Sequence, residues 1–179
     1  MSVQDSSAKD SPGSDDGGSS QWLIGAASAA LALREPTVPT EFIAKVFGLA
    51  APEDLQRYRP EDLAAMADHS WAFLGQRNAG AAKVRLAPDA AGRGVSVLEI
   101  VNDDMPFLLD SVTAELHERN LDISFLVHPV ISVERDDAGN LVGFETARKG
   151  KGERESFIHI HIDGLADAAA RAAASAKPS

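Results

Sequence analysis

The chain has 179 residues, a net charge of −10 and 44% hydrophobic residues, enough apolar material for one ordinary domain or two small ones. The acidic balance argues against a general nucleic-acid or anionic-membrane binder, because phosphate groups would be repelled. There is no cysteine, which excludes disulfides, thiolate metal sites and cysteine catalysis and fits a reducing, cytoplasmic setting.

The first residues, MSVQDSSAKDSPGSDDGGSS, are polar and acidic and lack the apolar core of a secretory signal. Such a composition cannot bury enough surface to offset the entropy of ordering, so 1–20 are predicted to form a disordered acidic tail. Downstream, no apolar run reaches the ~18 residues of a membrane-spanning helix. We therefore expect neither nucleic acid nor a membrane as a partner.

Residues 21–78 are predicted to form a helical N-terminal segment. The stretch 21–34 is alanine-rich and ends at a proline, and 42–47 places its apolar residues on one helical face. Two PEDL sequences, at 52–55 and 60–63, each put proline at the first helical position and acids in the first turn, where the helix dipole favours them. We interpret this pair as helix capping and not as a structural repeat.

After a Gly-containing boundary at 78–94 the composition becomes strand-like. The patterns predict a strand at 95–101, a helix at 107–119 and a strand at 123–133 that Pro129 bends or interrupts. A hairpin partner follows, and then a strand at 156–163 with isoleucines inward and His159 and His161 outward. The remaining predicted elements are a short strand at 83–87 and a C-terminal helix at 165–176.

This order predicts an α+β fold, a ferredoxin-like βαββα(β) antiparallel sheet preceded by a small helical layer. The sheet domain spans 83–176 and is predicted to be truncated before its last strand. We therefore expect the chain to belong to a larger protein, or to be completed by something else.

Three blocks, VLEIVNDDMPFLLDSVTAEL, ISFLVHPVISVERD and ESFIHIHID, resemble in order the N-terminal portion of the large bacterial NAD-specific glutamate dehydrogenases. The resemblance covers residues 40–165. It implies a helical segment followed by an ACT-like domain, a module that often binds amino acids where its first strand meets its first helix. It also implies a parent enzyme that converts L-glutamate to 2-oxoglutarate and ammonium with NAD. The expected partners are the remainder of the same long chain, the other subunits of a homo-oligomer and an amino-acid effector.

The strand-to-helix junction holds the main candidate site. Its acids are interpreted first as helix caps, which would stabilise the helix by ~0.5–2 kcal/mol. A ligand or partner contact is the second interpretation; a metal or catalytic role is least favoured, because no third ligand is evident nearby. Ligand-binding ACT domains usually have glycine where this chain has Phe107, whose side chain occupies the space a ligand needs. The ligand or interface candidates are Asn102, Asp103, Asp104, Met105, Pro106, Phe107 and His128.

His159 and His161 lie two residues apart, on one face of the predicted strand. Together with His128 they have the nitrogen donors that zinc uses, which makes them weak metal candidates. A hydrogen-bonded surface, or one covered by another layer or subunit, is the favoured interpretation. A pH-sensing contact is the third alternative.

The sequence offers no place for a dinucleotide, because no G-x-G-x-x-G follows a predicted strand. The charged loop RKGKGER at 148–154 lacks the spacing of a phosphate-binding loop and is interpreted as a solvated hairpin loop. We therefore expect no catalytic residue and no cofactor in this segment, NAD belonging to the parent enzyme. The predicted function is a non-catalytic regulatory or assembly region of an NAD-dependent glutamate dehydrogenase, with a stand-alone amino-acid sensor as the alternative.

Overall fold

The computed structural model describes residues 16–35, 37–90, 92–145 and 152–165. Within these ranges, no helix is both long and apolar enough to cross a membrane. The elements, in chain order, are α1 (Asp16–Arg34), α2 (Phe42–Phe47), α3 (Pro52–Leu55), α4 (Pro60–Leu74), β1 (Lys83–Pro88), β2 (Ser96–Asp103), α5 (Leu108–Glu118), β3 (Asp122–Val127), β4 (Val130–Arg135), β5 (Leu141–Phe144) and β6 (Glu153–Asp163).

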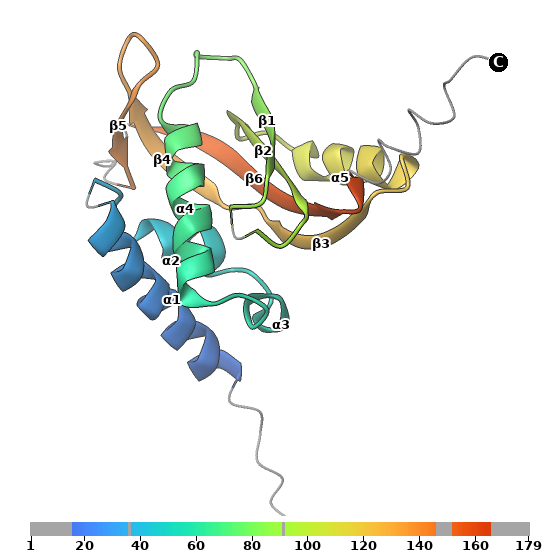
Figure 1. Ribbon diagram of the computed structural model, residues 1–179. Helices are drawn as coiled ribbons and strands as arrows, with labels where there is room; N and C mark the ends of the chain where they lie inside the picture. Colours follow the sequence, from blue (N-terminus) through green and yellow to red (C-terminus); the bar gives the residue numbers. More distant parts are fainter. Residues whose placement is uncertain (1–15, 36, 91, 146–151, 166–179) are drawn as a thin grey trace, which may run out of the picture.

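The strands form one antiparallel sheet in the order β1-β2-β6-β4-β5, with β3 also paired to β6. β3 lies along the C-terminal half of β6 and β4 along its N-terminal half, so both occupy the same side of that strand. They are separated at His128 and Pro129, which confirms the interruption predicted from the proline. Figure 1 shows α1–α4 gathered on one side of the sheet and α5 on the other.

The observed order of elements confirms the predicted α+β, ferredoxin-like fold with a helical layer before it. In a βαββαβ unit the last strand lies beside the first. Here β1, which precedes the unit, takes that position by pairing antiparallel with β2 over its whole length. Residues 166–179 lie outside the described part of the chain, so the C-terminal helix and the truncation after it stay predictions.

The N-terminal helix begins earlier than the sequence predicts. α1 starts at Asp16, inside the range 1–20 predicted to be disordered, while residues 1–15 lie outside the described part. Leu23, Ala27 and Leu31 form a buried stripe on α1, and this helix packs against α4. Because packing of an apolar face supports neighbouring turns, the helix extends beyond its apolar stretch into polar sequence.

The sheet is covered on both faces. On one face, four apolar residues of α5 pack over the isoleucines of β2 and β6. On the other, α1–α4 share a single apolar core with β2–β6 that includes Phe47, Phe125 and Phe157. The residues of α5 in the first contact are Leu108, Leu109, Val112 and Leu116.

The prediction that His159 and His161 point outward to a surface is therefore wrong in one respect. They do alternate with the isoleucines of β6, but they are only 2% and 1% exposed because the helical layer covers them. The alternative in which another layer packs over these side chains describes their position.

Phe47 tests this packing, because it joins α2 to the sheet through ring contacts with Phe125 and His159. Phe47→Ala should lower the free energy of unfolding by about 3–5 kcal/mol, because the buried apolar surface of the ring is lost and a cavity remains in its place. Leu49→Ala, at a side chain that is 85% exposed, should change it by less than ~0.5 kcal/mol. Urea unfolding measures both, and similar values for the two variants would contradict this docking of the helical layer.

Candidate functional site

The two acids at the β2–α5 junction are bound to arginines and do not cap the helix. Asp103 Oδ1 accepts a hydrogen bond from Arg77 Nη2. Asp104 accepts one from Arg154 Nε at 3.2 Å and one from Ser156 Oγ at 3.1 Å. The N-cap of α5 is Phe107, without a side-chain cap, so the predicted capping role is wrong. The physical reason is that the ladder with β6 continues through Asp104 N, which donates to Arg154 O at 3.0 Å.

Phe107 has an unusual backbone conformation. Its φ of 62° and ψ of 9° lie in the left-handed region, which costs a residue with a Cβ roughly 1–2 kcal/mol. Phe107 is 78% exposed, so burial of its side chain contributes little to offset this cost, and Met105 beside it is half-exposed. Glycine, the residue usual in ligand-binding ACT domains, would adopt this conformation without strain.

His128 lies at the break between β3 and β4, close enough to Asp104 for the carboxylate to affect its titration. Burial lowers the pKa of His128, and the charge of Asp104 partly opposes this. Its Nε2 atom is buried without a hydrogen-bond partner among the described residues. Of the other candidates, Asn102 contacts Met105 Sδ through its amide, and Pro106 is exposed.

A buried charge cluster lies beside this junction. Glu155 of β6 is fully buried and accepts hydrogen bonds from Arg77 Nε and from Arg135 Nε and Nη2, all at 2.8 Å. Both arginines also donate to backbone carbonyls, Arg77 to Ala81 and Arg135 to Leu74. Because one carboxylate accepts hydrogen bonds from guanidinium groups of two segments, the cluster ties the end of α4 to the sheet.

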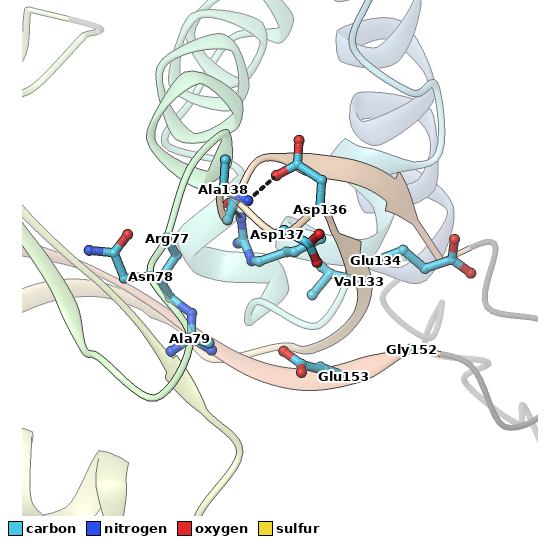
Figure 2. Close-up of a pocket in the computed structure, with 12 residues that line it drawn as sticks. Arg77, Asn78, Ala79, Val133, Glu134, Asp136, Asp137, Ala138, Gly152 and Glu153 are labelled. Carbon is cyan, nitrogen blue, oxygen red and sulfur yellow. Dashed lines mark hydrogen bonds between the residues drawn. The ribbon is translucent and has the colours of Figure 1, made fainter.

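An open cavity of about 750 Å³ adjoins this charge cluster. Figure 2 shows the residues that line it, contributed by the segment after α4, by β4 and its following turn, and by the start of β6. The guanidinium groups of Arg77 and Arg135 are engaged by Glu155, so the remaining rim charge is acidic. The acids of the rim are Glu134, Asp136, Asp137 and Glu153.

Local sequence patterns do not predict this cluster. Arg77 lies near the end of the predicted helical segment 21–78, and its contacts with Asp103 and Glu155 span 26 and 78 residues. Periodicity within a segment carries no information about such partners. The one local indication of the cluster is an arginine near the end of a predicted helical segment, and this indication is weak.

The helical layer and the sheet also meet through a chain of buried hydrogen bonds. Tyr58 Oη lies 2.9 Å from His161 Nδ1, and His161 Nε2 lies 2.9 Å from His159 Nε2. His159 Nδ1 lies 3.0 Å from Glu99 Oε1. Ser70 Oγ of α4 donates to the same oxygen at 2.6 Å, and Arg85 of β1 donates to Oε2. We call Tyr58, His161, His159, Glu99 and Arg85 the histidine relay.

Burial and pairing shift the titration of the relay. Burial alone would raise the pKa of Glu99, but its contacts with His159, Ser70 and Arg85 lower that pKa to about 2. Burial, and then the charge of His159, lowers the pKa of His161 to about 4. Burial raises the pKa of Tyr58 to about 12. The described residues contain no cluster of three or more histidines and acids able to hold a metal ion, and the two imidazoles bind each other instead.

Comparison with known proteins identifies the family. The model of the family described as "Glutamate dehydrogenase, ACT1 domain" matches residues 42–177. The chain belongs to this family. It is 33% identical over 138 residues to the NAD-specific glutamate dehydrogenase of Halomonas elongata, covering 73% of this chain and 9% of that protein. It is 31% identical over 136 residues to the protein of the same name from Pseudomonas aeruginosa, covering 72% of this chain and 8% of that protein.

The chain thus spans less than a tenth of the length of these two relatives. No solved structure matches it. The matched range includes the α2–α4 helices as well as the whole described sheet, so the charge cluster, the junction and the histidine relay all lie within the ACT1 family region.

Substitution of Phe107 tests the strained junction. Phe107→Gly should raise the free energy of unfolding by about 0.5–1 kcal/mol relative to Phe107→Ala, because only glycine relieves the left-handed conformation. Both variants remove the same exposed ring, so their difference isolates the backbone. Thermal or urea unfolding measures it, and an alanine variant as stable as the glycine variant would show that the position is unstrained.

Glu155→Gln tests the charge cluster. Loss of the buried carboxylate charge leaves Arg135 without its counter-ion and Arg77 with Asp103 alone, and should destabilise the protein by about 3–5 kcal/mol. Glu153→Gln, two residues earlier on the same strand but exposed, should stay within ~0.5 kcal/mol of the unaltered protein. Chemical denaturation compares the pair; a small effect at Glu155 would mean that the cluster does not hold the two layers together.

Proposed function

We propose that this chain is a non-catalytic regulatory and assembly region of an NAD-dependent glutamate dehydrogenase. The observation that carries the proposal is the ACT1 family match over most of the chain, combined with its small share of the named relatives. The oxidative deamination of L-glutamate, with NAD as the cofactor, would then belong to other parts of a larger protein. The partners would be those parts and the other subunits of a homo-oligomer.

The β2–α5 junction is the contact surface in this proposal. Met105 and Phe107 project apolar side chains into solvent from a backbone that Asp103 and Asp104 fix to the rest of the fold. A strained and exposed aromatic residue has no role in the stability of the isolated domain, whereas aromatic and methionine side chains are favoured at interfaces. The strain at Phe107 thus supports a role in association.

The alternative is an amino-acid sensor that binds its ligand at the same junction. The unpartnered Nε2 of His128, close to Asp104, is the observation that favours it. A bound amino acid has an ammonium group for the carboxylate and a hydrogen-bonding group for the imidazole. Phe107 argues against close approach to the backbone, since its Cβ occupies the place where glycine would leave room.

Association of the purified chain tests the proposal. Sedimentation velocity should show concentration-dependent self-association that weakens at least about tenfold in Kd when Met105 and Phe107 are both replaced by serine, because ~1.4 kcal/mol of apolar contact is lost. Replacement of Trp22 and Leu49, exposed residues of the helical layer, by serine is the matched control. A chain that stays monomeric at all concentrations would contradict an assembly role for this junction.

Calorimetric titration separates the sensor from the assembly region. Under the first proposal, none of the common amino acids gives binding heat with the folded chain. Under the alternative, one of them binds, and His128→Ala weakens that binding while His117→Ala on the exposed face of α5 does not. Glutamate-dependent reduction of NAD by the isolated chain would contradict both.

A further inference from the structure

The geometry points to an acid-sensitive latch: we propose that the His159–His161 pair holds the helical layer against the sheet while the pair carries at most one added proton. A second proton forces the two rings apart and releases the layer. This inference concerns the region by itself and does not depend on the proposed role in the enzyme.

The latch joins elements from both layers. Tyr58 and Ser70 belong to the helical layer, while His159, His161 and Glu99 belong to the central strands of the sheet. All five are buried. The rings of Phe47 and Phe125 pack edge-on against His159, and only a small cavity adjoins that imidazole, so an added charge there is poorly screened.

With both histidines neutral, one arrangement of protons satisfies every contact of the relay. Ionised Glu99 only accepts, so His159 donates from Nδ1 and accepts at Nε2. His161 must then donate from Nε2 and accept at Nδ1, where the hydroxyl of Tyr58 is the donor. Each of the three hydrogen bonds from Tyr58 to Glu99 has one proton, and the charge of Glu99 is balanced by Arg85.

One added proton is compatible with the same positions of the rings. It enters at His161 Nδ1, and Tyr58 rotates its hydroxyl so that its oxygen accepts. A single proton still lies between the two Nε2 atoms, whichever ring carries the charge. A second added proton places N–H groups on both Nε2 atoms, which are 2.9 Å apart. Neither has an acceptor there, and two imidazolium charges face each other, so this contact must open.

The other charged groups around the two histidines do not allow the pair to bind a second added proton. Glu99 is the one carboxylate in hydrogen-bonding contact with either ring among the described residues, and Arg85 already neutralises it. His69 of α4 lines the small cavity next to His159. Groups of opposite sign act on His161 from greater distance and partly cancel: Asp89, Arg93 and Asp163.

The expected direction with pH follows from the position of His161. A histidine whose pKa falls on folding binds its proton more weakly in the folded state than in the unfolded state. The stability that it contributes is therefore fully present above the unfolded pKa, at about pH 6.5, and is lost as the pH falls toward the folded pKa. With a pKa of about 4 in the folded protein and ~6.5 when unfolded, His161 alone lowers the folding equilibrium constant about 20-fold between about pH 7 and about pH 5. Glu99, with a pKa of about 2, contributes its own loss only at lower pH.

Hydrogen exchange of the unaltered 179-residue protein tests where the structure opens. As the pH is lowered, and after correction for the intrinsic exchange rates, amides of α4 should lose protection at a higher pH than amides of α5 on the opposite face. Simultaneous loss on both faces would show ordinary acid unfolding and overturn the latch. Nuclear magnetic resonance of the imidazoles supplies a second readout: the buried pair should titrate in two separate steps, and a single shared step without loss of structure would also overturn it.

His161→Gln tests the group itself. The glutamine amide can donate to His159 Nε2 and accept from the Tyr58 hydroxyl, but it does not titrate. We expect the variant to lose the 20-fold contribution of His161 and to keep that of His128, whose pKa burial also lowers, while His117→Gln on exposed α5 retains both. If His161→Gln keeps the full sensitivity, the pair is not the latch; if it does not fold, the two measurements on the unaltered protein decide.

Discussion

The central strand β6 has to satisfy one carboxylate and two imidazoles on a face that is closed to solvent. Its other face carries Ile158, Ile160 and Ile162, which pack beneath α5 and need only apolar neighbours. On the helical side, the polar side chains of Glu155, His159 and His161 alternate with Phe157. Each of these groups would cost several kcal/mol if buried alone, so their partners dictate what the helical layer must present to the sheet.

The helical layer meets this requirement at two separated points. Arg77, just after α4, reaches Glu155 at the beginning of β6, and Tyr58 and Ser70 reach the relay toward its end. Apolar packing between α2, α4 and the sheet fills the space between these points. Apolar contacts alone tolerate sliding of one layer over another, whereas hydrogen bonds at two points fix a single position. The polar contacts therefore specify how the layers are placed, and the apolar contacts supply most of the stability.

Local patterns were sufficient for most of the elements and insufficient for their partners. The PEDL sequences, the alternation in 123–133 and the proline within it each depend on residues a few positions apart, and helices α3 and α4 and the broken β3–β4 strand follow from them. A register shift between Ile123 and Phe125 sends these two residues to opposite faces, which alternation could not predict. The roles of Asp103 and Asp104 were misjudged because their arginines lie 26 and 50 residues away. The exposure of the histidine face was misjudged because a strand pattern does not reveal what covers it.

The same distinction bears on the junction itself. A carboxylate at a strand-to-helix turn normally has a local role, since the amides at a helix start need acceptors. Here Asp103 is held by Arg77, just after α4, and Asp104 by Arg154 and Ser156 of β6, while α5 begins at a residue in the left-handed conformation without a cap. The fold thus forgoes a local stabilisation of the helix and keeps Phe107 exposed in a strained conformation. Strain of this kind persists where another molecule or another part of the protein uses it, and this supports the proposal that the β2–α5 junction, and not the cavity beside Arg135, is the contact surface of this region.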